Sequence, residues 1–214
     1  RIRTTVTADG FETASGEWLW LHPADQADTT VDGKPDEWAD LPNSTIAYDW
    51  AWARFGRTTV QIHDGGEFFS YPPYSLDGRV TWQAAWSGEN LTFHVVLEDD
   101  QPILGANGEQ VRILLRTSGG DYELRIQPQA GASNSVLKHG DKTTTLKTVT
   151  ALSGQTVRIE IAVPWRTLGM TPKNGSIVGC DLFWTDVDME EGLRTEGTLR
   201  WAGGSTSGGY LWLR

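Results

Sequence analysis

Aromatic side chains between residues 50 and 74 are the first candidates for ligand chemistry, because a flat ring can stack on an apolar face of a ligand. The candidate ligand-binding rings are Trp50, Trp52, Phe68, Tyr71 and Tyr74. The stretch from Asp64 to Asp77 mixes such rings with paired glycines and prolines, so it is predicted to be a long ordered loop, as is typical of binding segments. The alternative is that its rings fold back onto a sheet as a local lid.

Acidic residues near the ends of apolar runs are the second candidates, because carboxylate oxygens supplied by loops suit Ca²⁺. These acids are Asp32, Asp36, Asp99, Asp100, Asp186 and Asp188. The candidate metal ligands among them are Asp99, Asp100, Asp32 and Asp36. Since no helix-flanked calcium loop is present, the alternative that these are solvated loop acids stays open.

No group of residues in the sequence indicates catalysis. The histidines, His22, His63, His94 and His139, lack the spacing of zinc ligands. No nucleophile elbow and no phosphate-binding glycine loop is found. A glycosidase would need two carboxylates held across a cleft, and no pair of acids is singled out by the sequence. We therefore expect no enzymatic activity.

The elements that must position these residues are predicted to be β-strands, because short or alternating apolar runs recur between Gly, Asn, Asp and Pro. The predicted strands are Glu17–Leu21, Thr45–Ala53, Thr58–His63, Gly78–Trp86, Asn90–Glu98, Gln110–Arg116, Tyr122–Gln127, Thr143–Ala151, Gln155–Val163, Ile177–Asp186, Thr198–Trp201 and Tyr210–Leu213. Hairpin connections such as Ser87–Asn90 favour antiparallel neighbours. The expected fold is all-β: a two-sheet antiparallel β-sandwich, jelly-roll or immunoglobulin-like, with one short helical turn at Pro164–Gly169.

Length and charge limit the function classes. One all-β domain can hold 214 residues. The formal net charge of -10 opposes nucleic acid as a partner, since binding to polyphosphates depends on Lys and Arg. No apolar stretch of about 18 residues occurs, so no membrane insertion is expected. The single cysteine, Cys180, excludes an internal disulfide and is expected to be a buried thiol.

Several blocks of sequence carry a family resemblance. In Val31–Trp38 an Asp-Gly pair is followed by two variable residues, an acid and a tryptophan. The further blocks, in order along the chain, are Val80–Asp100, Val157–Gly169, and Gly179–Asp186 with Leu199–Trp201. Together the blocks resemble the family 9 carbohydrate-binding modules over about residues 31 to 214. Residues 1–30 are expected to be an N-terminal extension or an extra strand, and residues 31–214 the β-sandwich itself.

The resemblance implies a β-sandwich that binds polysaccharide chain ends or oligosaccharides and is usually joined to a secreted glycoside hydrolase. It also implies that Trp38, Trp86, Trp165 and Trp201 lie in the core, because each matches a family position inside a strand or turn. The chain is then expected to be extracellular or periplasmic. No cofactor is expected to be required, with calcium as a candidate ion because relatives often hold it.

The sequence departs from the family at the sugar site. In sugar-binding members two indoles sandwich a sugar ring, but the matching positions here fall near Ala106 and in the shortened loop Ala202–Gly209, which holds no aromatic residue. Losing such stacking costs about 1 to 3 kcal/mol per ring, by analogy with stacked bases. The family's sugar-facing Glu is replaced by Arg112, whereas its sugar-facing Arg is matched by Arg125.

Arg112 and Arg125 are predicted to lie on adjacent strands and to offer two planar donor groups to one ligand. Such a pair would suit the carboxylate or sulfate of an acidic glycan. The alternative is cross-strand salt bridging to Glu109 or Glu123.

The leading hypothesis is a non-catalytic module that targets an extracellular protein to a polysaccharide or oligosaccharide. The expected partners are a glycan and a parent glycoside hydrolase or receptor. The alternative is a sensor or protein-docking domain of a larger extracytoplasmic protein, in which the sugar site has decayed. An enzyme would require a pair of convergent carboxylates in a deep cleft.

Overall fold

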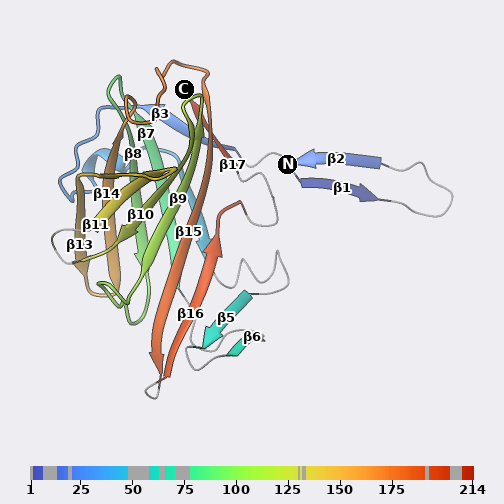
Figure 1. The fold of residues 1–214 in the computed structure, drawn as a ribbon, viewed down its shortest axis with the longest axis vertical. Helices are drawn as coiled ribbons and strands as arrows, with labels where there is room; N and C mark the ends of the chain where they lie inside the picture. Colours follow the sequence, from blue (N-terminus) through green and yellow to red (C-terminus); the bar gives the residue numbers. More distant parts are fainter. Residues whose placement is uncertain are drawn as a thin grey trace.

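The computed structural model describes residues 2–6, 14–18, 21–47, 58–62, 66–70, 78–129, 131, 134–190, 193–202 and 209–214. In these ranges the chain is built from β-strands and one short 3₁₀ helix, η1 (Asp36–Trp38) (Figure 1). No helix in the described ranges has the length and apolar character needed to cross a membrane. The predicted all-β class is confirmed.

The strands form one small hairpin and one large sheet. In chain order they are β1 (Ile2–Val6), β2 (Ala14–Trp18), β3 (Leu21–Gln26), β4 (Asn43–Ala47), β5 (Thr58–Ile62), β6 (Gly66–Ser70), β7 (Arg79–Trp86), β8 (Asn90–Glu98), β9 (Gln110–Thr117), β10 (Gly120–Gln127), β11 (Asn134–His139), β12 (Lys142–Thr145), β13 (Thr148–Ser153), β14 (Thr156–Pro164), β15 (Ile177–Glu190), β16 (Leu193–Arg200) and β17 (Gly209–Leu213). Among these elements β1 and β2 pair with each other, and the other strands belong to a 15-stranded sheet. Part of the range 1–30 therefore lies in the main sheet, as β3.

The main sheet is continuous and mixed, which corrects the prediction of two separate antiparallel sheets. Its order is β12-β11-β10-β9-β15-β17-β3-β7-β8-β14-β13, with β4, β5, β6 and β16 attached at the side of this path. Strand β3 pairs in parallel with both β17 and β7 and so joins the two halves, whereas the other described pairs are antiparallel. Hairpin signals report only strands that are close in sequence, so they could not reveal these pairings.

The sheet curls so that its two halves enclose one hydrophobic core (Figure 1). Inward-facing residues of both halves belong to a single cluster of buried side chains. Trp82 of β7 meets Trp201, which follows β16, edge to face with ring centroids 4.9 Å apart. Trp38, Trp86, Trp165 and Trp201 are all buried, which confirms their assignment to the core. Cys180 is also buried, and this burial raises the pKa of its thiol.

Several local predictions were wrong. Residues 66–70, predicted as loop, form β6, which pairs with β5. The adjacent phenylalanines have a high β propensity, which outweighed the turn formers around them. The single strand predicted at Thr143–Ala151 is two strands, β12 and β13, and β11 was not predicted. Asp186 and Asp188, which were expected in loops near strand ends, lie inside β15.

The predicted turn at Pro164–Gly169 is present as hydrogen-bonded turns too short to form a helix. The Leu168 amide donates to the carbonyl of Pro164 at 3.3 Å, and the Met170 amide donates to that of Trp165 at 3.2 Å. The indole of Trp165 donates from Nε1 to the carbonyl of Ser87 at 3.0 Å. The turn thus buries a tryptophan at one end of the core, as its sequence indicates.

Candidate functional site

The outer face of strands β10, β9, β15 and β16 carries a row of large side chains. Arg125 lies opposite Arg112, Arg112 opposite Phe183, and Phe183 opposite Arg200. Directly opposed residues on neighbouring strands have Cβ atoms about 4.5 to 5.5 Å apart, so these side chains are neighbours. The structure therefore brings Arg112 and Arg125 together on adjacent strands, as predicted.

Glu123 lies between the two arginines and forms an ion pair with each of them. Arg125 donates from Nη2 to Glu123 Oε2 at 2.8 Å, and Arg112 Nη1 lies 3.6 Å from Glu123 Oε1. This is the predicted alternative, cross-strand salt bridging, with Glu123 as the partner. The other proposed partner, Glu109, is buried at a different place. The arginine pair is thus already partly neutralised before a ligand arrives.

Phe183 is covered by cations. The guanidinium carbons of Arg112 and Arg200 lie 4.4 Å and 5.0 Å from the centroid of its ring. A guanidinium is attracted to the negative face of an aromatic ring, so this arrangement orients both side chains. Phe183 therefore positions arginines and does not offer an open platform to a sugar.

Beside this row the sheet carries a hollow of about 490 Å³, which we call the outer groove. Its charged lining consists of Arg116, Asp121, Glu123, Lys138, Asp181 and Arg200. Gly179 forms part of the lining, and a Cβ atom there would come within 2.8 Å of Arg116 Cβ. The missing side chain therefore helps to keep the hollow open.

Asp181 is the most deeply buried acid of the outer groove and is held in place from two sides. Arg200 donates from Nε to Asp181 Oδ2 at 2.6 Å, and the Ala202 amide donates to Oδ1 at 3.0 Å. Burial raises the pKa of Asp181, against the opposing effect of Arg200. Elsewhere in the groove, Arg116 donates from Nε to Asp121 at 2.8 Å.

An apolar strip adjoins the outer groove across strands β15, β17 and β3. It consists of Ile177, Leu21, Pro23, Tyr210 and Trp212. Tyr210 lies opposite Gly179 on one side and Leu21 on the other, while Trp212 lies between Ile177 and Pro23. Ile177 is 51% exposed, Leu21 43% and Trp212 38%. The strip was not predicted, although the alternation of Tyr210, Leu211 and Trp212 in a predicted strand places both rings on one face.

Of the predicted aromatic ligand residues, only Phe68 falls within the described residues. Trp50, Trp52, Tyr71 and Tyr74 fall outside the described residues. Phe68 lies in β6, opposite Val60 of β5.

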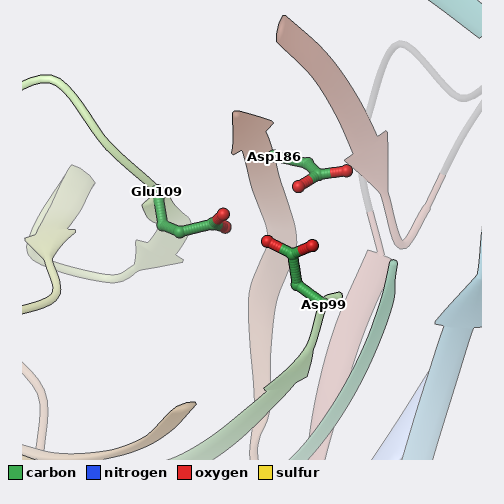
Figure 2. A group of neighbouring side chains, drawn as sticks. All are labelled: Asp99, Glu109 and Asp186. Carbon is green, nitrogen blue, oxygen red and sulfur yellow. The ribbon is translucent and has the colours of Figure 1, made fainter. Parts of the chain in front are cut away.

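A second concentration of charge lies in the interior. Asp99 follows β8, Glu109 precedes β9, and Asp186 belongs to β15; Figure 2 shows their carboxylates turned toward one another. One oxygen from each lies within 4.8 Å of the others. Asp99 is 4% exposed, and Glu109 and Asp186 are 0% exposed. Asp188 and Asp100 form a second such group with Asp99. We call these five acids the carboxylate cluster.

Hydrogen bonds satisfy only part of this cluster. The indole of Trp184 donates from Nε1 to Glu109 Oε2. In the described part of the chain, no N–H or O–H group donates to Glu109 Oε1 or to Asp99 Oδ2. Burial, and next the charge of Asp186, raises the pKa of Glu109 to about 10. A full set of ionised carboxylates is therefore unfavourable here without a counter-charge.

The four predicted metal ligands are not all at one place. Asp99 and Asp100 come together, and Asp188 joins them. No group of three metal-binding side chains within the described ranges includes Asp32 or Asp36. The Lys34 amide instead donates to Asp32 Oδ1 at 3.0 Å, and this hydrogen bond lowers the pKa of Asp32. The ammonium group of Lys34 lies 3.3 Å from the other oxygen of the same carboxylate.

Comparison with solved structures identifies the architecture. A family 9 carbohydrate-binding module from Caldicellulosiruptor kristjanssonii, in complex with glucose, superposes with a TM-score of 0.58 over 91% of this chain and 95% of that chain, at 14% identity. The fold is that of a family 9 carbohydrate-binding module. The module in complex with cellotriose gives a TM-score of 0.57 over 91% of this chain and 93% of that chain, at 15% identity.

A third structure comes from a Bacteroides uniformis protein to which carbohydrate binding has been ascribed. It is 10% identical, has a TM-score of 0.51, and covers 92% of this chain and 100% of its own. No protein-family model matches the sequence. No curated protein matches it either. The resemblance predicted from the sequence blocks is thus confirmed for the fold.

Proposed function

We propose that this chain is a non-catalytic carbohydrate-binding module that binds a polysaccharide or oligosaccharide in the outer groove. It would anchor a larger extracellular or periplasmic protein, such as a glycoside hydrolase or a receptor, to that glycan. The observation that carries the proposal is the outer groove itself, a hollow with paired donors and acceptors on a fold shared with modules solved in complex with glucose and cellotriose.

The chemistry of the outer groove favours a neutral glycan. A sugar hydroxyl both donates and accepts, so it can bond to a guanidinium and a carboxylate at once. The charged lining contains three cations, Arg116, Lys138 and Arg200, and three acids, Asp121, Glu123 and Asp181. Because the two sets balance, the hollow has no excess positive charge to attract a uronic acid or a sulfate. This argues against the acidic glycan suggested by the arginine pair alone.

The apolar strip would supply the stacking surface that the outer groove lacks. Tyr210 lies directly beside Gly179, which lines the groove. A pyranose ring seated in the groove would therefore have an aromatic neighbour on its β17 side. Aromatic rings that stack on sugars contribute both area and orientation to binding.

The same strip supports the second candidate function, a protein-docking domain. Exposed apolar side chains that adjoin one another on a folded surface mark sites for partners. Ile177, Leu21 and Trp212 would then contact protein, and the outer groove would hold no glycan.

Glycan binding can be tested with Arg116→Ala. Wild-type protein is expected to bind insoluble or soluble neutral polysaccharide in affinity electrophoresis and isothermal titration calorimetry. Loss of the Arg116 donor should weaken binding about 10- to 150-fold, since a charged hydrogen bond contributes about 1.5 to 3 kcal/mol. The matched control is Arg79→Ala, which removes an exposed arginine of β7 that pairs with Glu98 at 3.7 Å, away from the groove. Absence of binding across neutral and acidic glycans would move the assignment to the docking domain.

A further inference from the structure

The outer groove and the apolar strip share one line of residues that crosses the strands, which we call the cross-strand row. From β10 through β9, β15 and β17 to β3, with each residue directly opposite the next, it consists of Asp121, Arg116, Gly179, Tyr210 and Leu21. Neighbouring strands are about 4.8 Å apart, so the row spans about 19 Å. A single sugar ring is too short to contact the whole of it.

The cross-strand row changes from polar to apolar at Gly179. On one side, Arg116 Nε lies 2.8 Å from Asp121 Oδ1, and the two side chains are 58% and 75% exposed. On the other side, Tyr210 presents an aromatic ring and Leu21 an aliphatic side chain. Gly179 lines the outer groove and has no side chain. No side chain of β15 therefore separates the ion pair from the tyrosine.

A glycan chain matches this division of the cross-strand row. Hydroxyl groups at the edge of a pyranose both donate and accept, so they can bond to a guanidinium and a carboxylate at once. The C–H groups on its faces can stack on an aromatic ring. Arg116 and Asp121 together carry no net charge, and the apolar half contains no charged side chain. A neutral glycan therefore suits both halves, provided that it is long enough to reach from one to the other.

Trp212 widens the apolar half. It lies between Ile177 and Pro23 and follows Tyr210 by two residues in β17, so both rings lie on one face, about 7 Å apart along the strand. Trp212 is 38% exposed. The sheet thus offers two adjacent rings for stacking, and one terminal sugar cannot cover both of them.

Both ends of the cross-strand row are exposed. The side chain of Asp121 is 75% exposed at one end, and Leu21 is 43% exposed at the other. A site that selects the end of a chain must obstruct any unit beyond the last one, because internal units would otherwise fit equally well. A row with exposed ends gives a chain room to continue in both directions.

The cross-strand row is also twisted. Adjacent strands of a sheet are rotated by about 20 to 25°, so the steps from β10 to β3 turn the row by about 80 to 100° in total. A single hydrated chain can follow this turn, because its glycosidic bonds rotate. The flat face of a crystalline polysaccharide cannot follow it.

We propose that the cross-strand row binds internal units of a single, neutral polysaccharide chain that runs across the strands. The hydroxyl groups of the chain bond to Arg116 and Asp121, and its ring faces stack on Tyr210 and Trp212. This inference rests on the proposed function and adds the part of the glycan that is recognised, which is the side of a chain rather than its end.

Binding stoichiometry and chain length test this mode of recognition. Calorimetry uses cello-, xylo- and manno-oligosaccharides of one to six units, together with the parent soluble polysaccharides. The affinity for the matching series should rise about tenfold or more between two and five units, as the second half of the row becomes occupied. Several modules should bind each polysaccharide chain. Affinity independent of length, with no more than one module per chain end, would overturn the inference and leave the proposed function intact. Binding to none of these glycans would overturn both.

Two variants locate the chain on the row. Tyr210→Ala and Trp212→Ala should each weaken binding of the six-unit oligosaccharide about tenfold, by analogy with the loss of one stacked base. The matched control is Leu152→Ala, which removes an apolar side chain of β13 that is 48% exposed and should bind as wild type does. Melting temperatures verify that all three variants are folded. Unchanged affinity in both ring variants, or tighter binding to crystalline than to amorphous cellulose, would contradict this path.

Discussion

The outer groove and the carboxylate cluster lie on opposite faces of strands β9 and β15 and toward different ends of them, and their charges are arranged in opposite ways. In the groove, acids face cations: Glu123 pairs with Arg125 at 2.8 Å and Asp181 with Arg200 at 2.6 Å. In the cluster, acids face acids. Half-exposed opposite charges neutralise one another, and each of them can exchange its ion-pair partner for a polar group of a ligand. A buried set of like charges is unfavourable when every member is ionised, and burial raises the pKa of Glu109 to about 10.

The acids of the two ion pairs differ in burial, since Asp181 is more deeply buried than Glu123. Replacement of Asp181 therefore has the largest expected effect. Asp181→Ala should destabilise the protein by about 3 to 5 kcal/mol, because it removes the buried acid of an ion pair and the acceptor that Arg200 and the buried Ala202 amide share. Urea unfolding followed by tryptophan fluorescence measures the loss. A change below about 1 kcal/mol would show that Asp181 behaves like an exposed acid, and the contrast with the cluster would weaken.

A buried histidine, His94, shows a third arrangement, in which the ionisable group stays neutral in the folded protein. Burial lowers the pKa of His94 from 6.5 to about 4. The unfolded state therefore takes up a proton before the folded state does, and stability present above pH 6.5 is lost as the pH falls toward 4. The loss should be about 3 kcal/mol, since one pKa unit is worth about 1.4 kcal/mol.

The pH effect is measured by urea unfolding at several pH values. His22, whose pKa burial also lowers to about 4, contributes in the same direction. His94→Gln should therefore reduce the slope of stability against pH between 6.5 and 4 without abolishing it. An unchanged slope in the variant would show that other groups cause the acid sensitivity.

The smallest expected effect belongs to the exposed side of the groove. Glu123→Gln removes the acid shared by Arg112 and Arg125 and should cost less than about 1 kcal/mol of stability, with the difference shrinking at high salt. The same variant gives the groove an excess of positive charge, so it should bind acidic oligosaccharides more tightly than wild type does. Calorimetry with a uronic-acid oligosaccharide measures this affinity. An unchanged affinity would show that Glu123 does not influence which glycan binds.

Part of the site could be predicted from the sequence because it depends on local pattern. Arg112 and Arg125 each occupy the polar positions of an alternating strand, and a short Gly-rich connection at residues 118–120 makes those strands neighbours. The burial of the four core tryptophans followed from their place in strand and turn motifs. The sequence predicted the ion pairs with Glu123 only as one of two alternatives, because the alternation of a strand gives the face on which a side chain lies but not its partner.

By itself the sequence determined the all-β class, most strand positions and the side of each strand that faces the core, because these follow from a two-residue period. Only the tertiary structure decided that β3 joins the two halves in parallel, that Phe183 lies under two arginines, and that Asp99, Glu109 and Asp186 meet. The reason is that these contacts join segments distant in the chain, and the curl of the whole sheet, rather than any local pattern, brings them together.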